Sequence, residues 1–176
     1  MIRFPDTPVI GESDCPDPAG YERFQPFIKG VFSQWHPAPF VIDGTEYSCA
    51  EQYMMAAKAS LFGDSDIAAR IMATDDPALQ KRLGAQVSGF DDEVWREWRL
   101  HIVYLANHAK FSQNAGALRQ LRNTVPAMLV EANPRDWNWG NGLHIDDPAN
   151  QNPDEWRGTN YLGRILTPVR DEFGTH

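Results

Sequence analysis

The stretch from Ser48 to Phe62 reads SCAEQYMMAAKASLF and predicts one continuous helix. Each residue advances about 100° around a helix, so Glu51 and Lys58, seven positions apart, return to nearly the same face. Met54 and Met55 lie between them and would supply apolar packing. The stretch therefore predicts a carboxylate and an amine on one face of one helix.

Both residues also have an ordinary structural interpretation. Ser48 followed by Glu51 fits a capping box, in which the serine accepts a hydrogen bond from an early helix amide and the glutamate reaches back to the cap. A lysine on a helix, such as Lys58, is most often solvated. A catalytic role for the pair is therefore a hypothesis that depends on residues elsewhere in the chain.

Length and composition limit the possible architectures. The chain has 176 residues, 42% of them hydrophobic, which is enough to bury one good core. We expect an irregular lead-in over residues 1–20 and a single domain over residues 21–176. Cys15 and Cys49 are the only cysteines and lack metal-ligand spacing, so no disulfide framework or zinc site is expected. No signal peptide or membrane span is evident, and we expect a cytoplasmic protein.

The charge balance restricts the possible partners. The net charge is −8, with 16 basic against 24 acidic residues. Broad contact with a nucleic-acid backbone depends on clustered Lys and Arg, so an extended nucleic-acid interface is not expected. A local pocket for one or two phosphates is compatible with this balance, because a site can differ in sign from the whole surface. The sequence gives no indication of the oligomeric state.

Helices dominate the predicted secondary structure. Cap residues and apolar periodicity predict further helices over residues 64–72, 77–84, 91–111, 115–122 and 161–173. Pro168 is expected to interrupt the last one. Short extended segments are predicted at 32–37, 40–44 and 127–130, with Asp43-Gly44 as a turn. The predicted class is mostly α, multihelical, with a few short β-strands.

Two features suggest contacts with a flat, phosphorylated ligand. Trp95 lies on the apolar face of the 91–111 helix and is either a core residue or a wall on which a base stacks. The loop 136–143, DWNWGNGL, combines two glycines with two aromatic residues and an acid. Such a backbone forms either a tight turn or a loop that brings amides close to phosphate or sugar oxygens. It lacks the glycine spacing of a Rossmann or P-loop site.

An ordered set of short motifs runs through the chain: Phe32-Ser33, Phe40, Asp43-Gly44, Glu51, Lys58, Trp95, Lys110-Phe111, Gln113-Asn114, Glu131, Asp136, Trp139-Gly140-x-Gly142-Leu143, Trp156-x-Gly158-x-Asn160-x-Leu162-Gly163 and Val169-Arg170. Taken in this order, they resemble the NADAR family, also called YbiA-like. The resemblance covers nearly the whole chain, from about Tyr21 to Arg170. Met54-Met55 and Pro168 depart from the family pattern.

The resemblance implies an enzyme, an N-glycosidase that hydrolyses the bond between a ribose C1 and an exocyclic amino nitrogen. Two substrate classes are associated with the family: ribosylamino-pyrimidine phosphates of early riboflavin synthesis, and ADP-ribose attached to the amino group of guanine. The acidic charge balance favours the small phosphorylated metabolite. Removal of ADP-ribose from guanine, and a non-catalytic module that binds ADP-ribose or NAD, stay as alternatives. No cofactor is implied.

The resemblance also implies roles for individual residues. Glu51 would be the general acid and base, Lys58 a nucleophilic amine, and Asp136 a second carboxylate that holds ribose hydroxyls or water. If Lys58 stays charged, the alternative is an oxocarbenium-like path in which Glu51 or Asp136 directs water. The acids and the histidine between residues 136 and 155 are irregularly spaced, so no metal site is expected. The expected substrate-binding residues are Phe32, Ser33, Trp95, Trp139, Gly140, Asn141, Gly142, Arg157 and Asn160.

Overall fold

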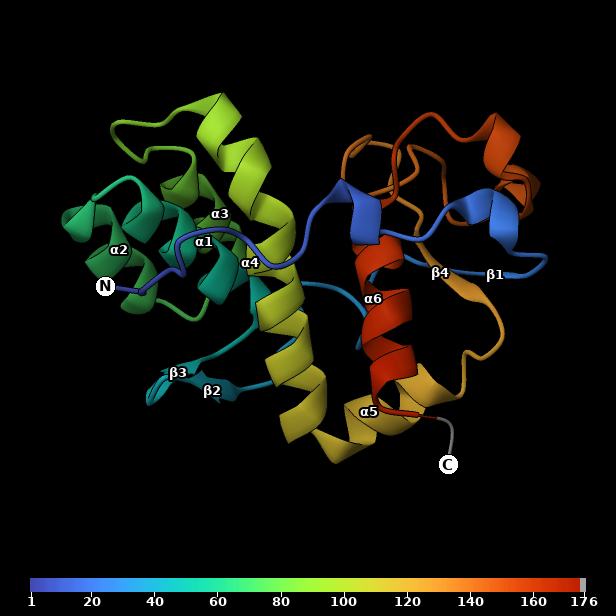
Figure 1. Ribbon diagram of the computed structural model, residues 1–176, viewed down its shortest axis with the longest axis horizontal. Coiled ribbons are helices and arrows are strands. Elements are labelled where there is room, and N and C mark those ends of the chain that lie inside the picture. Colours follow the sequence, from blue (N-terminus) through green and yellow to red (C-terminus); the bar gives the residue numbers. More distant parts are fainter. Residues whose placement is uncertain (175–176) are drawn as a thin grey trace. The chain divides into compact units, whose positions relative to one another are not determined.

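The structure is a computed structural model that describes residues 1–174 (Figure 1). Within these residues it contains six α-helices, four short strands and four short 3-10 helices, so the prediction of a mostly α class with a few strands is confirmed. The domain that we expected ends at residue 176, and residues 175 and 176 lie outside the described part. Across residues 1–174, no helix has both the length and the apolar character that a membrane span requires.

The chain forms two compact units, each with its own internal contacts. The first unit comprises Met1–Glu12 and Gln34–Asn114. The second comprises Ser13–Ser33 and the chain from Ala115 onward. The expectation of a single domain stays a prediction, and each unit is described by itself.

Helix α1 is the central element of the first unit. It packs against α2, α3 and α4, and the hairpin of β2 and β3 completes the unit (Figure 1). The carboxylates of Asp64, Asp76 and Asp91 accept hydrogen bonds from the first-turn amides of α2, α3 and α4, so the predicted starts of these helices are confirmed. The elements are β2 (Phe40–Ile42), β3 (Thr45–Tyr47), α1 (Ala50–Leu61), α2 (Ser65–Met72), α3 (Pro77–Gly84) and α4 (Asp92–Gln113).

The β2–β3 hairpin turns at the predicted dipeptide. Asp43 and Gly44 both have positive φ, 49° and 78°, as a two-residue type I′ turn requires. The antiparallel register pairs Phe40 with Tyr47, and both rings are buried against Tyr53 of α1. This aromatic contact fixes the hairpin against the helix that carries Glu51 and Lys58.

In the second unit, helix α6 packs on a two-stranded parallel sheet. Strand β1 (Phe24–Phe27) pairs with β4 (Met128–Glu131), and α6 (Tyr161–Glu172) covers β4. Helix α5 (Ala115–Arg122) follows the predicted range, and α6 continues through Pro168 without a break. The hydroxyl of Thr167 donates to the carbonyl of Gly163 and so satisfies one acceptor in the turn before the proline.

One prediction about extended structure was wrong, and one strand was missed. Residues 32–37 form turns and bends, because the amide of Ser33 donates back to the carbonyl of Gly30 and closes a turn. Strand β1 was not predicted, since its partner β4 lies about one hundred residues later and Pro26 interrupts its apolar pattern. The strand predicted at 127–130 is present one residue later, as β4.

The predicted capping box at Ser48 is also wrong. Helix α1 begins at Ala50, and its N-cap is Cys49, which makes no side-chain cap hydrogen bond. Gln52 reaches back instead: its Oε1 accepts from the amide of Ser48 at 2.7 Å, and its Nε2 donates to the carbonyl of Ile71. Gln52, one position after Glu51, therefore makes the contact back to Ser48 that we assigned to Glu51.

The lead-in over residues 1–20 makes specific contacts and is not loosely packed. In the first unit, the amide of Ile2 donates to Ser60, and the ring of Phe4 meets Trp98 edge to face at 5.3 Å. In the second unit, the guanidinium of Arg164 donates to the carbonyl of Pro16 at 3.0 Å. The many prolines and glycines therefore produce an irregular path, which is nevertheless held by hydrogen bonds and rings.

Candidate active site

Helix α1 holds Glu51 and Lys58 in the first unit, as the sequence predicts. Glu51 lies in the first turn and is 6% exposed, and Lys58 lies in the last turn and is half-buried. The amide of Glu51 donates to the carbonyl of Gln34, which fixes the start of the helix against the preceding segment. A buried carboxylate and a half-buried amine on one helix are a combination suited to proton transfer and nucleophilic chemistry.

Two aromatic rings border the amine of Lys58. Its Nζ lies 4.5 Å from the centroid of the Phe90 ring and 5.5 Å from the centroid of the Trp95 ring. Trp95 is 9% exposed, whereas Phe90 is 45% exposed. Lys58 therefore has a buried aromatic wall on one side and a partly exposed ring on another.

Two opposing influences act on the charge of Lys58. Burial lowers the pKa of its amine, and this is the larger effect. The nearby carboxylate of Glu51 raises the same pKa, because it stabilises the ammonium form. The net pKa lies below that of a solvated lysine, so a larger fraction of the amine is neutral at a given pH.

The two methionines between Glu51 and Lys58 fill the core. Met54 and Met55 are both buried, and the Sδ of Met54 receives a hydrogen bond from Gln34. Met55 packs directly on Gly84, where a Cβ atom would collide with its sulfur. The glycine in α3 thus leaves room for the side chain of Met55.

The loop that carries Asp136 lies in the second unit and is closed by that carboxylate. Its Oδ1 accepts hydrogen bonds from the amides of Asn138 at 2.9 Å and Trp139 at 2.8 Å. This is an Asx turn, which orients the following aromatic and glycine residues. The structure therefore gives one oxygen of Asp136 a local structural role.

The two glycine-containing blocks of the sequence pair with each other. The carbonyl of Asn141 accepts from the amides of Arg157 and Gly158, and the carbonyl of Gly140 accepts from the amide of Asn160. Gly158 is required for this approach, because a Cβ atom there would collide with the carbonyl of Gly140. The amide of Asn141 donates to the carbonyl of Glu131 in β4 at 2.9 Å, so this donor is already used within the fold.

Asn160 connects strand β4 to the start of helix α6. Its Oδ1 accepts from the amide of Glu131 at 2.9 Å, and its Nδ2 donates to the carbonyl of Leu129 at 3.0 Å. It is fully buried, and its φ of 52° places it in the left-handed region that asparagine tolerates. These contacts explain its residue type without a ligand.

The remaining predicted binding residues also lie in the second unit. Phe32 packs edge to face on Phe27 of β1, with ring centroids 5.6 Å apart, and Trp139 meets Tyr161 at 6.3 Å. Arg157 is exposed, and its Cβ would collide with a Cβ atom at Gly142. The structure thus brings Glu51, Lys58 and Trp95 together in the first unit, while Ser33, Asp136 and the loop residues lie in the second unit.

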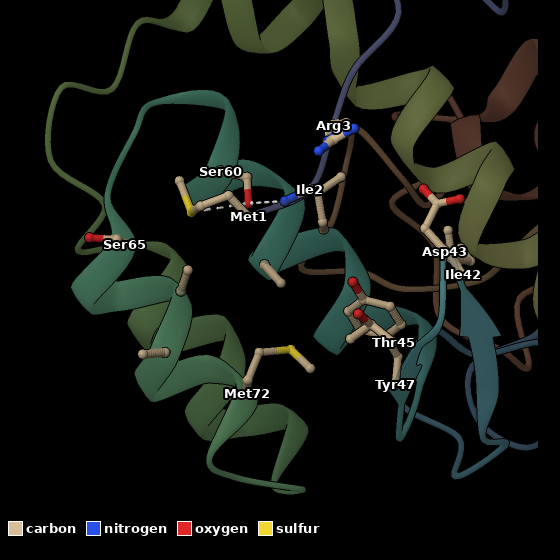
Figure 2. Close-up of a pocket in the computed structure, with 13 residues that line it drawn as sticks. Met1, Ile2, Arg3, Ile42, Asp43, Thr45, Tyr47, Ser60, Ser65 and Met72 are labelled. Atoms are coloured by element: carbon tan, nitrogen blue, oxygen red, sulfur yellow. Dashed lines mark hydrogen bonds between the residues drawn. The ribbon is translucent and has the colours of Figure 1, made fainter.

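A cavity of about 780 Å³ lies in the first unit but does not contain the predicted catalytic pair (Figure 2). Ala56 and Ser60 of α1 line it, and each is two positions from Lys58, so both face roughly the opposite side of the helix. The other walls come from residues 1–3, the β2–β3 hairpin and helix α2. The Lys58 side of α1 instead has the ring of Trp95 beside the amine and the electrostatic influence of Glu51 on it.

Two residues of interest were missed or not assigned a role from the sequence. Phe90 precedes the cap of α4, and nothing in the sequence indicates that its ring reaches Lys58. Lys110 is 0% exposed, and burial lowers the pKa of its amine to about 7. Within residues 1–174, no group of three His, Cys, Asp or Glu side chains is placed to hold a metal ion.

Comparison with known proteins gives a consistent set of matches. The family model of the NADAR domain matches residues 23–174. N-glycosidase R617 of Acanthamoeba polyphaga mimivirus is 40% identical over 147 residues, which cover 81% of this chain and 86% of that protein. The riboflavin biosynthesis protein VVA0006 of Vibrio vulnificus is 27% identical over 84% of this chain, and the match covers 36% of that protein. The NMR structure of the Escherichia coli protein YbiA superposes with a TM-score of 0.71 at 27% identity, covering 86% of this chain and 85% of that one.

Proposed function

The chain belongs to the NADAR domain family, and from this premise we propose that it is a hydrolase that cleaves an N-glycosyl bond with Glu51 and Lys58. Relatives that match most of its length are named N-glycosidases. The observation that carries the proposal is the environment of Lys58: a half-buried amine with a lowered pKa, close to a carboxylate and a buried tryptophan. A carboxylate can supply general acid and base catalysis to the cleavage of a glycosylamine, and an amine with a lowered pKa can supply a nucleophile.

In the proposed reaction Lys58 exchanges with the leaving base. Glu51, acting as an acid, promotes opening of the sugar ring to an imine between C1 and the amino nitrogen of the base. The neutral amine of Lys58 adds to C1, and the base departs as a free amine after it takes up a proton. A C=N bond then joins C1 to Lys58, and water adds to this carbon with Glu51 as base, releasing the sugar and regenerating the amine.

The lowered pKa of Lys58 favours this path over one without a covalent bond. An ammonium cannot attack C1, so the fraction of neutral amine sets the concentration of the nucleophile. The competing path has an oxocarbenium-like transition state, with water directed by Glu51 or Asp136 and Lys58 as a cationic contact. Glu51 serves both paths, because it is the buried carboxylate on the same helix as the amine.

For the substrate, we propose a ribosylamino-pyrimidine phosphate. Relatives named for riboflavin biosynthesis, together with the acidic balance of this chain, support a small phosphorylated metabolite. In the first unit, Trp95 would stack on the base. In the second unit, exposed Arg157 stays a candidate for contact with a phosphate. Phe32, Ser33, Trp139, Gly140 and Gly142 stay candidates for sugar and phosphate contacts. Asn141 and Asn160 would act by shaping the loop, since their side chains bond within the fold.

Asp136 is proposed as the second carboxylate that holds ribose hydroxyls or water. One of its oxygens already closes the Asx turn, and asparagine can accept the same two hydrogen bonds. Asp136→Asn is therefore a variant that removes the charge while keeping the turn. A loss of turnover with an unchanged melting temperature would support the role in catalysis, and unchanged turnover would limit Asp136 to the turn.

The test is a parallel incubation of the purified protein with two substrates, a ribosylamino-pyrimidine phosphate and ADP-ribosylated guanosine, with mass-spectrometric quantification of the released base. We expect release from the first substrate. Release should fall at least about a hundredfold in Glu51→Gln and in Lys58→Arg. Lys81→Arg is the matched control, because Lys81 is exposed on α3 and should keep full activity.

The other outcomes discriminate among the alternatives. Release of guanosine alone would identify an ADP-ribosyl glycohydrolase. Binding of ADP-ribose without release from either substrate would indicate a non-catalytic module and overturn the assignments of Glu51 and Lys58.

A further inference from the structure

Phe90 is a partly exposed aromatic residue that lies beside the proposed nucleophile. Its ring centroid is 4.5 Å from Nζ of Lys58, closer than the centroid of Trp95 at 5.5 Å. Phe90 is 45% exposed, so its side chain is only partly buried against its neighbours. The distance is within the range at which the face of a ring attracts a cation.

The backbone on both sides of Phe90 is anchored by carboxylates. The amide and hydroxyl of Ser88 both donate to Asp64, at 2.8 and 2.9 Å. Asp91 caps helix α4 by accepting from the amide of Glu93 at 2.9 Å. Phe90 therefore lies in a short segment whose two ends are fixed, which holds the ring near Lys58.

A second ring sets the orientation of Phe90 from the side. Phe62, the C-cap residue of α1, meets Phe90 with ring centroids 5.3 Å apart and planes at 61°. Edge-to-face contacts of this kind favour a defined orientation. Because Phe62 follows Lys58 by one helical turn, the three side chains form a local cluster at the end of α1.

We propose that Phe90 is a positioning residue whose ring face stabilises the positive charge on the nitrogen of Lys58 while the sugar is attached to it. The inference rests on the proposed function, in which C1 and Nζ share a C=N bond. That nitrogen is cationic when protonated, and it occupies the place of the ammonium near the ring. Water then adds to C1, a proton passes to Glu51, and the C–N bond breaks to release the sugar and the neutral amine.

Leucine at position 90 keeps an apolar cover of similar size but has no π-face, so Phe90→Leu should lower kcat by about 3- to 30-fold. KM should change less than about twofold, because the affected charge develops after substrate binding. Phe90→Tyr keeps the ring and should retain kcat within about twofold.

The experiment measures kcat and KM from released base for the wild-type protein and for Phe90→Leu, Phe90→Tyr and Phe4→Leu, each with its melting temperature. Phe4→Leu is the matched control, since it removes a ring of the same unit that packs on Trp98 and is not one of the two rings beside the amine of Lys58. The inference is supported if kcat falls in Phe90→Leu, returns in Phe90→Tyr and is nearly unchanged in Phe4→Leu.

Contrary outcomes separate this inference from the proposed function. Equal kcat in Phe90→Leu and the wild type, while Lys58→Arg is inactive, would overturn the role of Phe90 and leave the proposed function intact. A change in KM alone would likewise overturn it. If the wild-type protein releases base from neither substrate, both the proposed function and the inference fall.

Discussion

The Nζ atom of Lys58 lies 5.5 Å from the centroid of the Trp95 ring, and this tryptophan is buried at the start of α4. The contact joins two elements, α1 and α4, which supply the predicted nucleophile and the predicted stacking wall. An amine in such a position loses part of its hydration, so its charge becomes sensitive to neighbouring groups. The most direct of these groups is Glu51.

We predict that Glu51→Gln lowers the pKa of Lys58 further. The carboxylate stabilises the ammonium form, so its removal leaves the effect of burial unopposed. The sequence has four lysines, Lys29, Lys58, Lys81 and Lys110, so an NMR titration of lysine labelled with carbon-13 at Cε resolves each amine. Lys58→Arg assigns the signal. An unchanged pKa in Glu51→Gln would contradict the proposed coupling between the two groups.

The matched control for this titration is Glu46→Gln. Glu46 is an exposed carboxylate on β3 in the same unit, and it is not among the groups that act on the pKa of Lys58. Removing this carboxylate should leave the pKa of Lys58 unchanged, because the interaction of exposed charges is weak and is screened by salt.

A second prediction concerns the start of α1. Gln52→Ala should lower the free energy of unfolding by about 2–3 kcal/mol, because the buried amide of Gln52 bonds to Ser48, Ile71 and Thr74. Ser48→Ala should cost less than about 1 kcal/mol, since Ser48 is not the N-cap. Urea denaturation measures both values. A larger loss in Ser48→Ala than in Gln52→Ala would favour the capping box after all.

Helix boundaries were predictable from the sequence because the signals are local. Asp64, Asp76 and Asp91 each cap the helix that follows within a few residues, and the Asp43-Gly44 turn needs only its own backbone angles. Strand β1 could not be predicted in this way, since its hydrogen bonds go to a strand about one hundred residues away.

The candidate site was predictable to a similar extent. The helical spacing of Glu51 and Lys58 places them on one helix, but it cannot show that burial lowers the amine pKa or that Phe90 lies nearby. For Asn160, the sequence motif does not reveal the structural role of the side chain. Its motif suggests a ligand contact, whereas its side chain bridges β4 and α6, a role visible only when both elements are in place.

Asn160→Ala should therefore destabilise the protein. Both side-chain hydrogen bonds would be lost, leaving the amide of Glu131 and the carbonyl of Leu129 without this partner, and alanine tolerates a positive φ less well. We expect a loss of about 3–4 kcal/mol in the free energy of unfolding. Asn123→Ala, at an exposed asparagine, is the control and should change stability by less than about 0.5 kcal/mol. If Asn160→Ala is as stable as the wild type but binds substrate less well, the result would instead support a contact between Asn160 and the ligand.

Lys110 predicts a pH dependence of stability. Its pKa is about 7 in the folded protein against an ordinary 10.5, so the unfolded chain binds more protons between these values. The free energy of unfolding should therefore increase as the pH rises from about 7 towards 10.5, and decrease again as the pH returns to about 7. Lys110→Met removes this dependence. Between pH 7 and pH 10, the free energy of unfolding of the wild type should therefore rise relative to that of the variant by on the order of 2–4 kcal/mol. Parallel pH profiles for the two proteins would contradict the buried, neutral amine.

The most direct test of the central claim is reductive trapping of the covalent intermediate. The protein is mixed with a ribosylamino-pyrimidine phosphate, reduced with sodium borohydride and digested, and the peptides are mapped by mass spectrometry. The account predicts a ribose phosphate adduct on Lys58, none on Lys29, Lys81 or Lys110, and none in Lys58→Arg. Base release without any trapped adduct, at full rate in Lys58→Arg, would contradict Lys58 as the nucleophile.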